Sequence, residues 1–197
     1  MLDLNLQTAR ELLNKNMQNQ NLRRHCIAVG KALSAYFDYY TKNSGDTCGL
    51  TKEQWEIAGI LHDADYELTK DQPEKHTLVV LDWLKDYDAP QELLDVFKTH
   101  NTKTTHLKEP ETIIEWTLEC CDELTGFIVA VALVMPEKRL ADVTVERVLA
   151  KFKNKDFAKQ VDRNQILQCK EKLAIEPEEF VRITLTAMQE NSSELGL

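Results

Sequence analysis

The sequence contains no hydrophobic run long enough to cross a membrane and no C-x-x-C motif. Its longest apolar stretch, GFIVAVALVM at 126–135, has about half the length of a membrane span. The five cysteines are irregularly spaced and form no C-x-x-C pair, which disfavours zinc knuckles and thioredoxin-type sites. The first residues lack the charged and apolar regions of a signal peptide. We therefore expect a cytoplasmic protein with free thiols and no membrane contact.

Positive charge is also scarce, with 24 Lys and Arg against 33 Asp and Glu and a net charge of −9. A nucleic-acid backbone requires clustered Lys and Arg, so no nucleic acid polymer is expected as a partner. Neither a P-loop nor a Rossmann fingerprint is present. The most basic part of the chain is the segment 147–163. We interpret it either as a solvated helix face or as a lid that turns its positive charge toward the phosphate of a substrate. Its cations are Arg147, Lys151, Lys153, Lys155, Lys159 and Arg163.

Helical periodicity dominates the 197 residues and predicts an all-α fold. Thr51 with Gln54, and Asp71 with Glu74, have the spacing of capping boxes, which predicts that a helix starts at each pair. The Val- and Ile-rich stretch 127–135 has strand propensity, but an isolated strand would have no partner, so we expect a helix. The expected helices cover 7–18, 20–40, 51–63, 71–85, 90–101, 110–126, 127–135, 144–152, 156–161, 163–172 and 177–191.

A weak boundary follows Pro136, within 136–142. We expect residues 1–136 to form a helical core that carries the functional site. Residues 137–197 are expected to form a C-terminal helical extension that packs on this core, so that the whole chain is one structural domain.

Several ionisable residues fall on the apolar faces of the expected helices. His25, for example, follows Leu22 by three positions and precedes Val29 by four, which places all three on one helix face. Buried carboxylates are costly unless they are paired or bound to a metal, and a divalent cation prefers neutral imidazole and ionised carboxylate. The sequence therefore predicts a metal centre, and its candidate ligands are His25, His62, Asp63, His76, His100 and Asp122.

Mixed nitrogen and oxygen ligands without thiolate suit a catalytic ion better than a structural zinc. The expected cofactor is one or two divalent ions per chain, drawn from Mn, Fe, Co, Ni, Zn or Mg. His106 lies among Thr and Lys and is left out of the set.

The order of these residues resembles the H…HD…D signature of the HD-domain superfamily of metal-dependent phosphohydrolases. AGILHDADYE, PEKH, THN, CDELTGFIVAVALVMP and KFKNKDFAKQVDR are similar to a bacterial branch of predicted HD-superfamily hydrolases, over most of the chain. Cys121 stands where that branch usually has alanine. The resemblance implies an HD-type helical bundle with additional C-terminal helices.

The resemblance also implies a role for each ligand. A first metal would be held by His25, His62, Asp63 and Asp122, and Asp63 would bridge to a second metal held by His76 and His100. Glu67 would act as a nearby acid, with Asp71 as an alternative that an N-cap explains equally well. Lys103 is the candidate phosphate contact, and Glu123 and Thr125 are candidates for supporting the ligands.

The expected activity is hydrolysis of a phosphate ester or anhydride of a small, nucleotide-like metabolite by metal-activated water, with Asp63, Glu67 and Lys103 as catalytic candidates. One alternative is a non-catalytic module that binds a nucleotide or a protein partner on the HD scaffold. Another is a di-iron oxygenase with the same ligands. The sequence leaves the oligomeric state open, a homodimer included.

Overall fold

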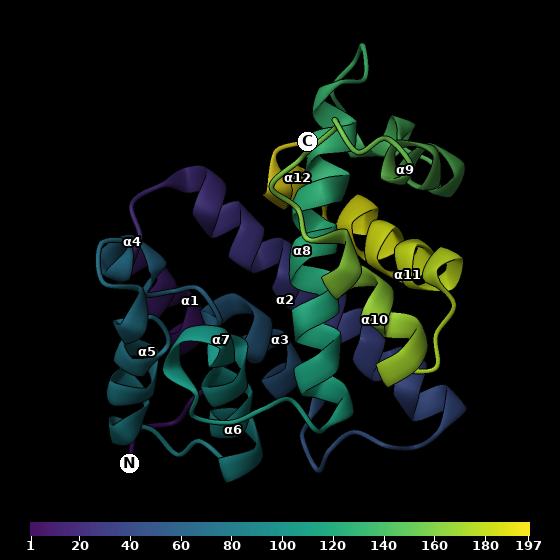
Figure 1. The fold of residues 1–197 in the computed structure, drawn as a ribbon. Coiled ribbons are helices and arrows are strands. Elements are labelled where there is room, and N and C mark those ends of the chain that lie inside the picture. Colours follow the sequence, from purple (N-terminus) through teal and green to yellow (C-terminus); the bar gives the residue numbers. More distant parts are fainter.

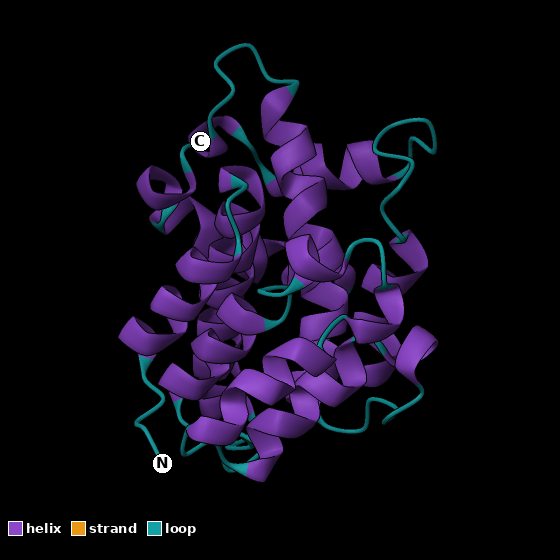
Figure 2. Ribbon diagram, turned by 90° about the vertical axis from the view of Figure 1, so that its left-hand side faces the viewer, coloured by secondary structure: helices purple, strands orange, loops and turns teal.

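The computed structural model describes residues 1–197 and contains helices but no strand, as Figure 2 shows. None of the helices combines the length and apolar character that crossing a membrane requires. The α-helices are, in chain order, α1 (Leu6–Asn16), α2 (Gln20–Asn43), α3 (Lys52–Leu61), α4 (Tyr66–Thr69), α5 (Leu78–Trp83), α6 (Gln91–His100), α7 (Thr102–Thr105), α8 (Ile113–Leu133), α9 (Val145–Phe152), α10 (Arg163–Lys172), α11 (Pro177–Glu190) and α12 (Ser192–Leu195).

Helices α2 and α8 form the centre of the fold. In Figure 1, α8 runs through the middle, with α1 and α3 to α7 on one side and α9 to α11 on the other. The hydroxyl of Tyr36 on α2 donates to the Phe180 carbonyl of α11 at 2.8 Å, and both side chains are fully buried. One continuous apolar core therefore includes residues from both sides of the boundary expected near 136.

A pair of glycines sets the distance between α2 and α3. A Cβ placed on Gly59 would lie 2.5 Å from the backbone nitrogen of Gly30, and a Cβ on Gly30 would lie 3.0 Å from the Glu56 carbonyl oxygen. The two backbones can therefore approach this closely only because neither residue has a side chain. This contact brings His62, which follows Gly59 by one helical turn, against His25 on α2.

The structure confirms the all-α prediction and most of the predicted helices. The Thr51–Gln54 capping box is present, and α10 has the predicted bounds. The segments predicted at 110–126 and 127–135 form one helix, α8, so the strand alternative does not occur. Four of the five cysteines are buried and all are free, in line with the expected reduced thiols.

Two of the predicted helices are wrong. Residues 71–85 contain the 3₁₀ turn Pro73–Lys75 and then α5, and no side chain caps either start. The reason is Thr77, whose left-handed backbone (φ 72°) breaks the helix just after His76. Residues 156–161 form turns rather than a helix, because the Arg163 guanidinium binds carbonyls there, including those of Phe157 and Ala158.

Candidate metal centre

The structure brings all six predicted ligands together, although they come from five different parts of the chain. Helix α2 supplies His25, the end of α3 supplies His62 and Asp63, and the turn before α5 supplies His76. His100 is the last residue of α6, and Asp122 lies in the middle of α8.

Asp63 is the hub of this cluster, because each of its oxygens faces a different pair of histidines. Its Oδ1 lies 3.1 Å from His76 Nε2 and 3.3 Å from His100 Nε2. Its Oδ2 lies 3.6 Å from His62 Nε2 and 3.9 Å from His25 Nε2. One carboxylate thus links two groups of imidazoles.

Asp122 completes the second group. Its Oδ1 lies 2.8 Å from His25 Nε2 and 3.4 Å from His62 Nε2. Ligand atoms of His25, His62 and Asp122 lie within 4.8 Å of one another, as do those of His62, Asp63 and His100. Either triad is compact enough for one cation, and His62 is common to both.

Two of the histidines form a hydrogen bond through Nδ1 to a carboxylate other than Asp63 and Asp122. The Nδ1–H of His76 donates to Asp65 Oδ1 at 2.7 Å, and that of His100 donates to Glu119 Oε1 at 3.1 Å. Asp65 is fully buried, and its other oxygen accepts the Val80 backbone N–H. Carboxylate partners of this kind orient metal-binding imidazoles and raise their basicity.

The other two histidines are held by uncharged oxygens. The Nδ1–H of His62 donates to the Gly59 carbonyl at 2.7 Å. Thr125 donates its hydroxyl hydrogen to the Asp122 carbonyl at 2.8 Å, so its oxygen can accept the Nδ1–H of His25 at 3.4 Å. All four imidazoles therefore turn Nε2, the atom that a metal would use, toward the two carboxylates.

His62 provides the sharpest test of whether a cation fits. Its Nδ1 carries the hydrogen, so in the neutral ring Nε2 presents a lone pair. This Nε2 is buried and has no hydrogen-bond partner, although it faces oxygens of Asp63 and Asp122. A lone pair opposite two carboxylates is repulsive in a buried site, and either a proton on Nε2 or a cation between the three groups removes the repulsion, so the donor set fits a divalent metal.

When no metal is bound, electrostatics in the cluster lower the pKa values of Asp63 and Asp122 and raise those of His25, His76 and His100. Burial acts to raise the pKa of Asp63, but His62 and His100 outweigh it and hold that pKa well below its usual range. Burial likewise acts to lower the pKa of His100, but its hydrogen bonds to Asp63 and Glu119 raise it well above the usual value. A divalent cation would replace these protons as the balancing positive charge.

The buried thiols near the cluster are poor candidates for ligands. Burial raises the pKa of Cys26 and of Cys121 well above the usual value, and the neighbouring Asp63 and Asp122 add to the effect. Both therefore stay protonated, and the site offers nitrogen and oxygen donors.

Lys103 lies next to the cluster, at the edge of a cavity of about 240 Å³ that His100 and Asp122 also line. Its ammonium donates to Gln165 Oε1 at 3.2 Å, and its side chain is 74% exposed. Every residue that lines this cavity is polar, and Lys103 is its only Lys or Arg. The phosphate contact assigned to Lys103 stays a prediction.

Glu67 and Asp71 are not brought into the cluster. The Glu67 carboxylate accepts the backbone N–H groups of Gln18 and Asn19, just before α2, and these two bonds lower its pKa. Asp71 is exposed and caps no helix. The catalytic role assigned to Glu67 stays a prediction, but its hydrogen bonds indicate a structural task.

Arg163, the last cation of the basic segment 147–163, binds within that segment and to α8 rather than the cluster. Arg163 is held by backbone carbonyls, and its guanidinium stacks over Phe127 and Phe152. Glu123, expected to support the ligands, instead accepts the backbone N–H of Asp162 at 3.0 Å. Thr125 does contact His25, as expected.

Asp65 and Glu119 are the site residues that sequence reasoning missed. Glu119 precedes Asp122 by three positions and so shares its helix face, which is a signal that could have found it. Asp65 follows Asp63 by two positions in a non-helical turn, where no periodicity applies.

No family model matches the sequence, and comparison with the curated proteins and with the solved structures gives no significant match.

Proposed function

We propose that this protein is a metal-dependent phosphohydrolase of the HD-domain type, which hydrolyses a phosphate ester or anhydride of a small metabolite. The observation that carries the proposal is the Asp63 carboxylate, which faces one pair of histidines with each oxygen. A carboxylate that faces nitrogen ligands on either side could bridge two metal ions, and a pair of metals can stabilise both the attacking and the leaving oxygen in phosphoryl hydrolysis.

We assign metal binding and phosphate binding to different residues of the site. His25, His62 and Asp122 would hold one cation and His76 with His100 the other, while Asp63 would contact both. Bound divalent metal supplies a water of lowered pKa and positive charge for the phosphoryl oxygens. Lys103, at the polar cavity beside His100, would hold a phosphate oxygen that the metals do not contact.

Metal content gives the first test. Protein purified without chelator is analysed by elemental mass spectrometry, beside Asp63→Asn and the matched control Asp71→Asn. We expect one or two metals per chain in the wild type and in the control, and loss of metal from Asp63→Asn, because an amide oxygen cannot replace an ionised bridge.

Phosphatase activity gives the second test. The three proteins are assayed against a panel of phosphate esters and anhydrides with added Mn, Co or Mg, together with His76→Gln and the exposed control His106→Asn. Hydrolysis lost in Asp63→Asn and His76→Gln but kept in both controls supports the proposal.

The alternative functions correspond to other outcomes. Stoichiometric metal without hydrolysis of any ester or anhydride would favour a binding module on the same scaffold. Bound iron with a near-ultraviolet absorption band after aerobic purification would favour an oxygenase. A wild type without metal, whose thermal stability does not respond to added Mn or Zn, would refute the metal centre itself.

A further inference from the structure

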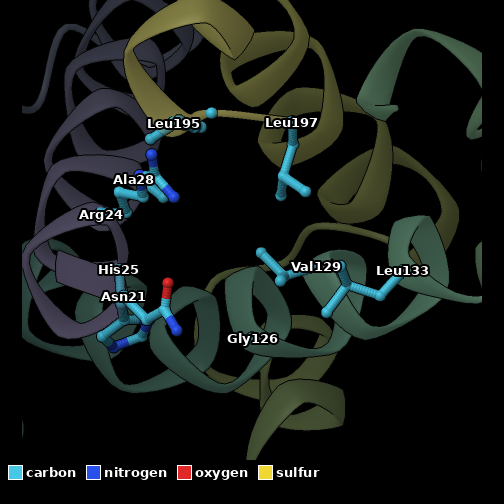
Figure 3. Close-up of a pocket in the computed structure, with 10 residues that line it drawn as sticks. Asn21, Arg24, His25, Ala28, Gly126, Val129, Leu133, Leu195 and Leu197 are labelled. Carbon is cyan, nitrogen blue, oxygen red and sulfur yellow. The ribbon is translucent and has the colours of Figure 1, made fainter. Parts of the chain in front are cut away.

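A second cavity shares His25 with the metal cluster. It has a volume of about 370 Å³, within the range of roughly 300–1,000 Å³ that small-molecule pockets have. It lies between α2, α8 and the end of α12, and Figure 3 shows the α2 residues on one side, Val129 and Leu133 of α8 on another, and Leu195 with Leu197 on a third.

The walls of this cavity are largely apolar. Ala28 of α2 is buried, Val129 and Leu197 are half-buried, and Leu133 is exposed although it is a large aliphatic side chain. Such walls do not suit a bare phosphate, but they suit a ring that is removed from water on binding.

The rim of this cavity carries two polar side chains that have no hydrogen-bond or ion-pair partner in the protein. Arg24, directly before His25, makes no hydrogen bond and no ion pair, and its guanidinium lies against Gly196, where a Cβ would come within 2.6 Å of Cζ. The Asn21 side-chain amide also lacks a protein partner and lies one turn earlier on the same face of α2. An unpaired guanidinium next to a hydrolytic centre is suited to an anion or a carbonyl of a ligand.

Gly126 of α8 contributes to the size of this cavity. A Cβ built on it would meet no atom within 4 Å, unlike the Cβ atoms that Gly30 and Gly59 would carry. A side chain at position 126 would thus enter the cavity without displacing the packing of α8.

We propose that this cavity receives the organic group of the phosphate substrate, a planar and largely apolar ring of nucleobase or aryl size, with Arg24 and Asn21 binding polar groups at its rim. The inference rests on the proposed function for its substrate, and its place beside His25 would put the ester oxygen at the cluster. Substrates without a ring would reach the metals but leave the cavity unfilled.

Calorimetric titration and steady-state kinetics test the proposal together. The probes are adenosine 5′-monophosphate and phenyl phosphate, which carry rings, and methyl phosphate, which does not. The variants are Gly126→Leu, which fills the cavity, and the matched control Gly126→Ala, which leaves most of it open. Arg24→Gln is paired with Arg182→Gln, whose guanidinium binds Glu178 and Glu179 on the surface of α11.

We expect Gly126→Leu to weaken binding of at least one ring-bearing probe by about tenfold or more, with metal content and methyl phosphate hydrolysis unchanged. Arg24→Gln should weaken the same probe by about three- to tenfold, and neither control should do so. Weaker binding of adenosine 5′-monophosphate alone would indicate a nucleobase site, and weaker binding of phenyl phosphate would indicate a site for a simple aryl ring.

Unchanged binding in Gly126→Leu, or failure of the wild type to bind either ring-bearing probe, would overturn the inference. Hydrolysis of the ring-bearing probes that persists equally in Gly126→Leu would overturn the inference but leave the proposed function intact. Ring binding that depends on Gly126 without hydrolysis of any probe would support the cavity and count against the phosphohydrolase.

Discussion

Replacing Gly59 by alanine should lower both the stability of the fold and the metal affinity of the proposed centre. The new Cβ would lie 2.5 to 2.7 Å from three backbone atoms of α2, where ordinary van der Waals contact begins at 3.4 Å. These atoms belong to the main chain and cannot rotate away, so α2 and α3 would have to separate by roughly 1 Å.

This separation has two measurable consequences. Overpacking of this kind costs about 1–3 kcal/mol of unfolding free energy, more than alanine gains over glycine in a helix. Because His62 donates to the Gly59 carbonyl, its ring would move together with α3, away from His25 and Asp122. We expect metal affinity to fall by about tenfold or more.

The matched control is Gly126→Ala, a second glycine inside a helix, with open space beside it. This variant should gain about 0.5–1 kcal/mol, because alanine loses less backbone entropy on folding. Urea unfolding at equal protein concentration measures both changes, and competition with a metallochromic indicator measures the metal affinity. A Gly59→Ala protein as stable as the wild type, with undiminished metal affinity, would refute the packing argument.

Three further expectations follow from the structure. The raised pKa of His100 stabilises the metal-free protein below its unfolded-state value near 6.5, and this stability is lost as pH rises through the folded-state pKa. Metal binding requires the neutral ring, so added Zn²⁺ should raise the melting temperature more at about pH 8 than at about pH 6, and an equal rise at both would contradict this. Glu119→Gln should weaken metal binding by about ten- to a hundredfold with little loss of stability, measured by the same indicator competition, and unchanged affinity would remove Glu119 from the site. Glu115→Ala should cost about 1–3 kcal/mol in urea unfolding, because the buried carboxylate accepts the N–H groups of Glu111 and Thr112 and pairs with Lys108, and a smaller loss would mean that solvent replaces these bonds.

The sequence predicted the cluster because helical periodicity reports which residues face the core. His25, His100 and Asp122 each lie within a helix, on the same face as buried aliphatic residues, and the structure brings them together. The structure also brings His76 to the cluster, but its predicted local structure was wrong, since it lies in the turn before α5 rather than in a helix.

Helical periodicity does not predict which helices and turns contact one another in the folded protein. The left-handed backbone of the buried Thr77 depends on tertiary packing and leaves no mark in local propensity. Glu67 was the nearby acid that the family resemblance implied. Its carboxylate instead binds the backbone before α2, which became visible only once α2 and α4 were placed beside each other.

The contact of Gln165 with Glu119 means that the cluster depends on α10 as well as on the helices that carry its ligands. Its amide Nε2 donates to Glu119 Oε2 at 2.7 Å, and Glu119 in turn holds His100. A shorter protein that ended at residue 136 would keep all six candidate ligands, but it would lose the Gln165 amide that donates to the Glu119 carboxylate. Transplanting the ligands alone into another helical scaffold would omit the same support, so a functional graft would have to include α10.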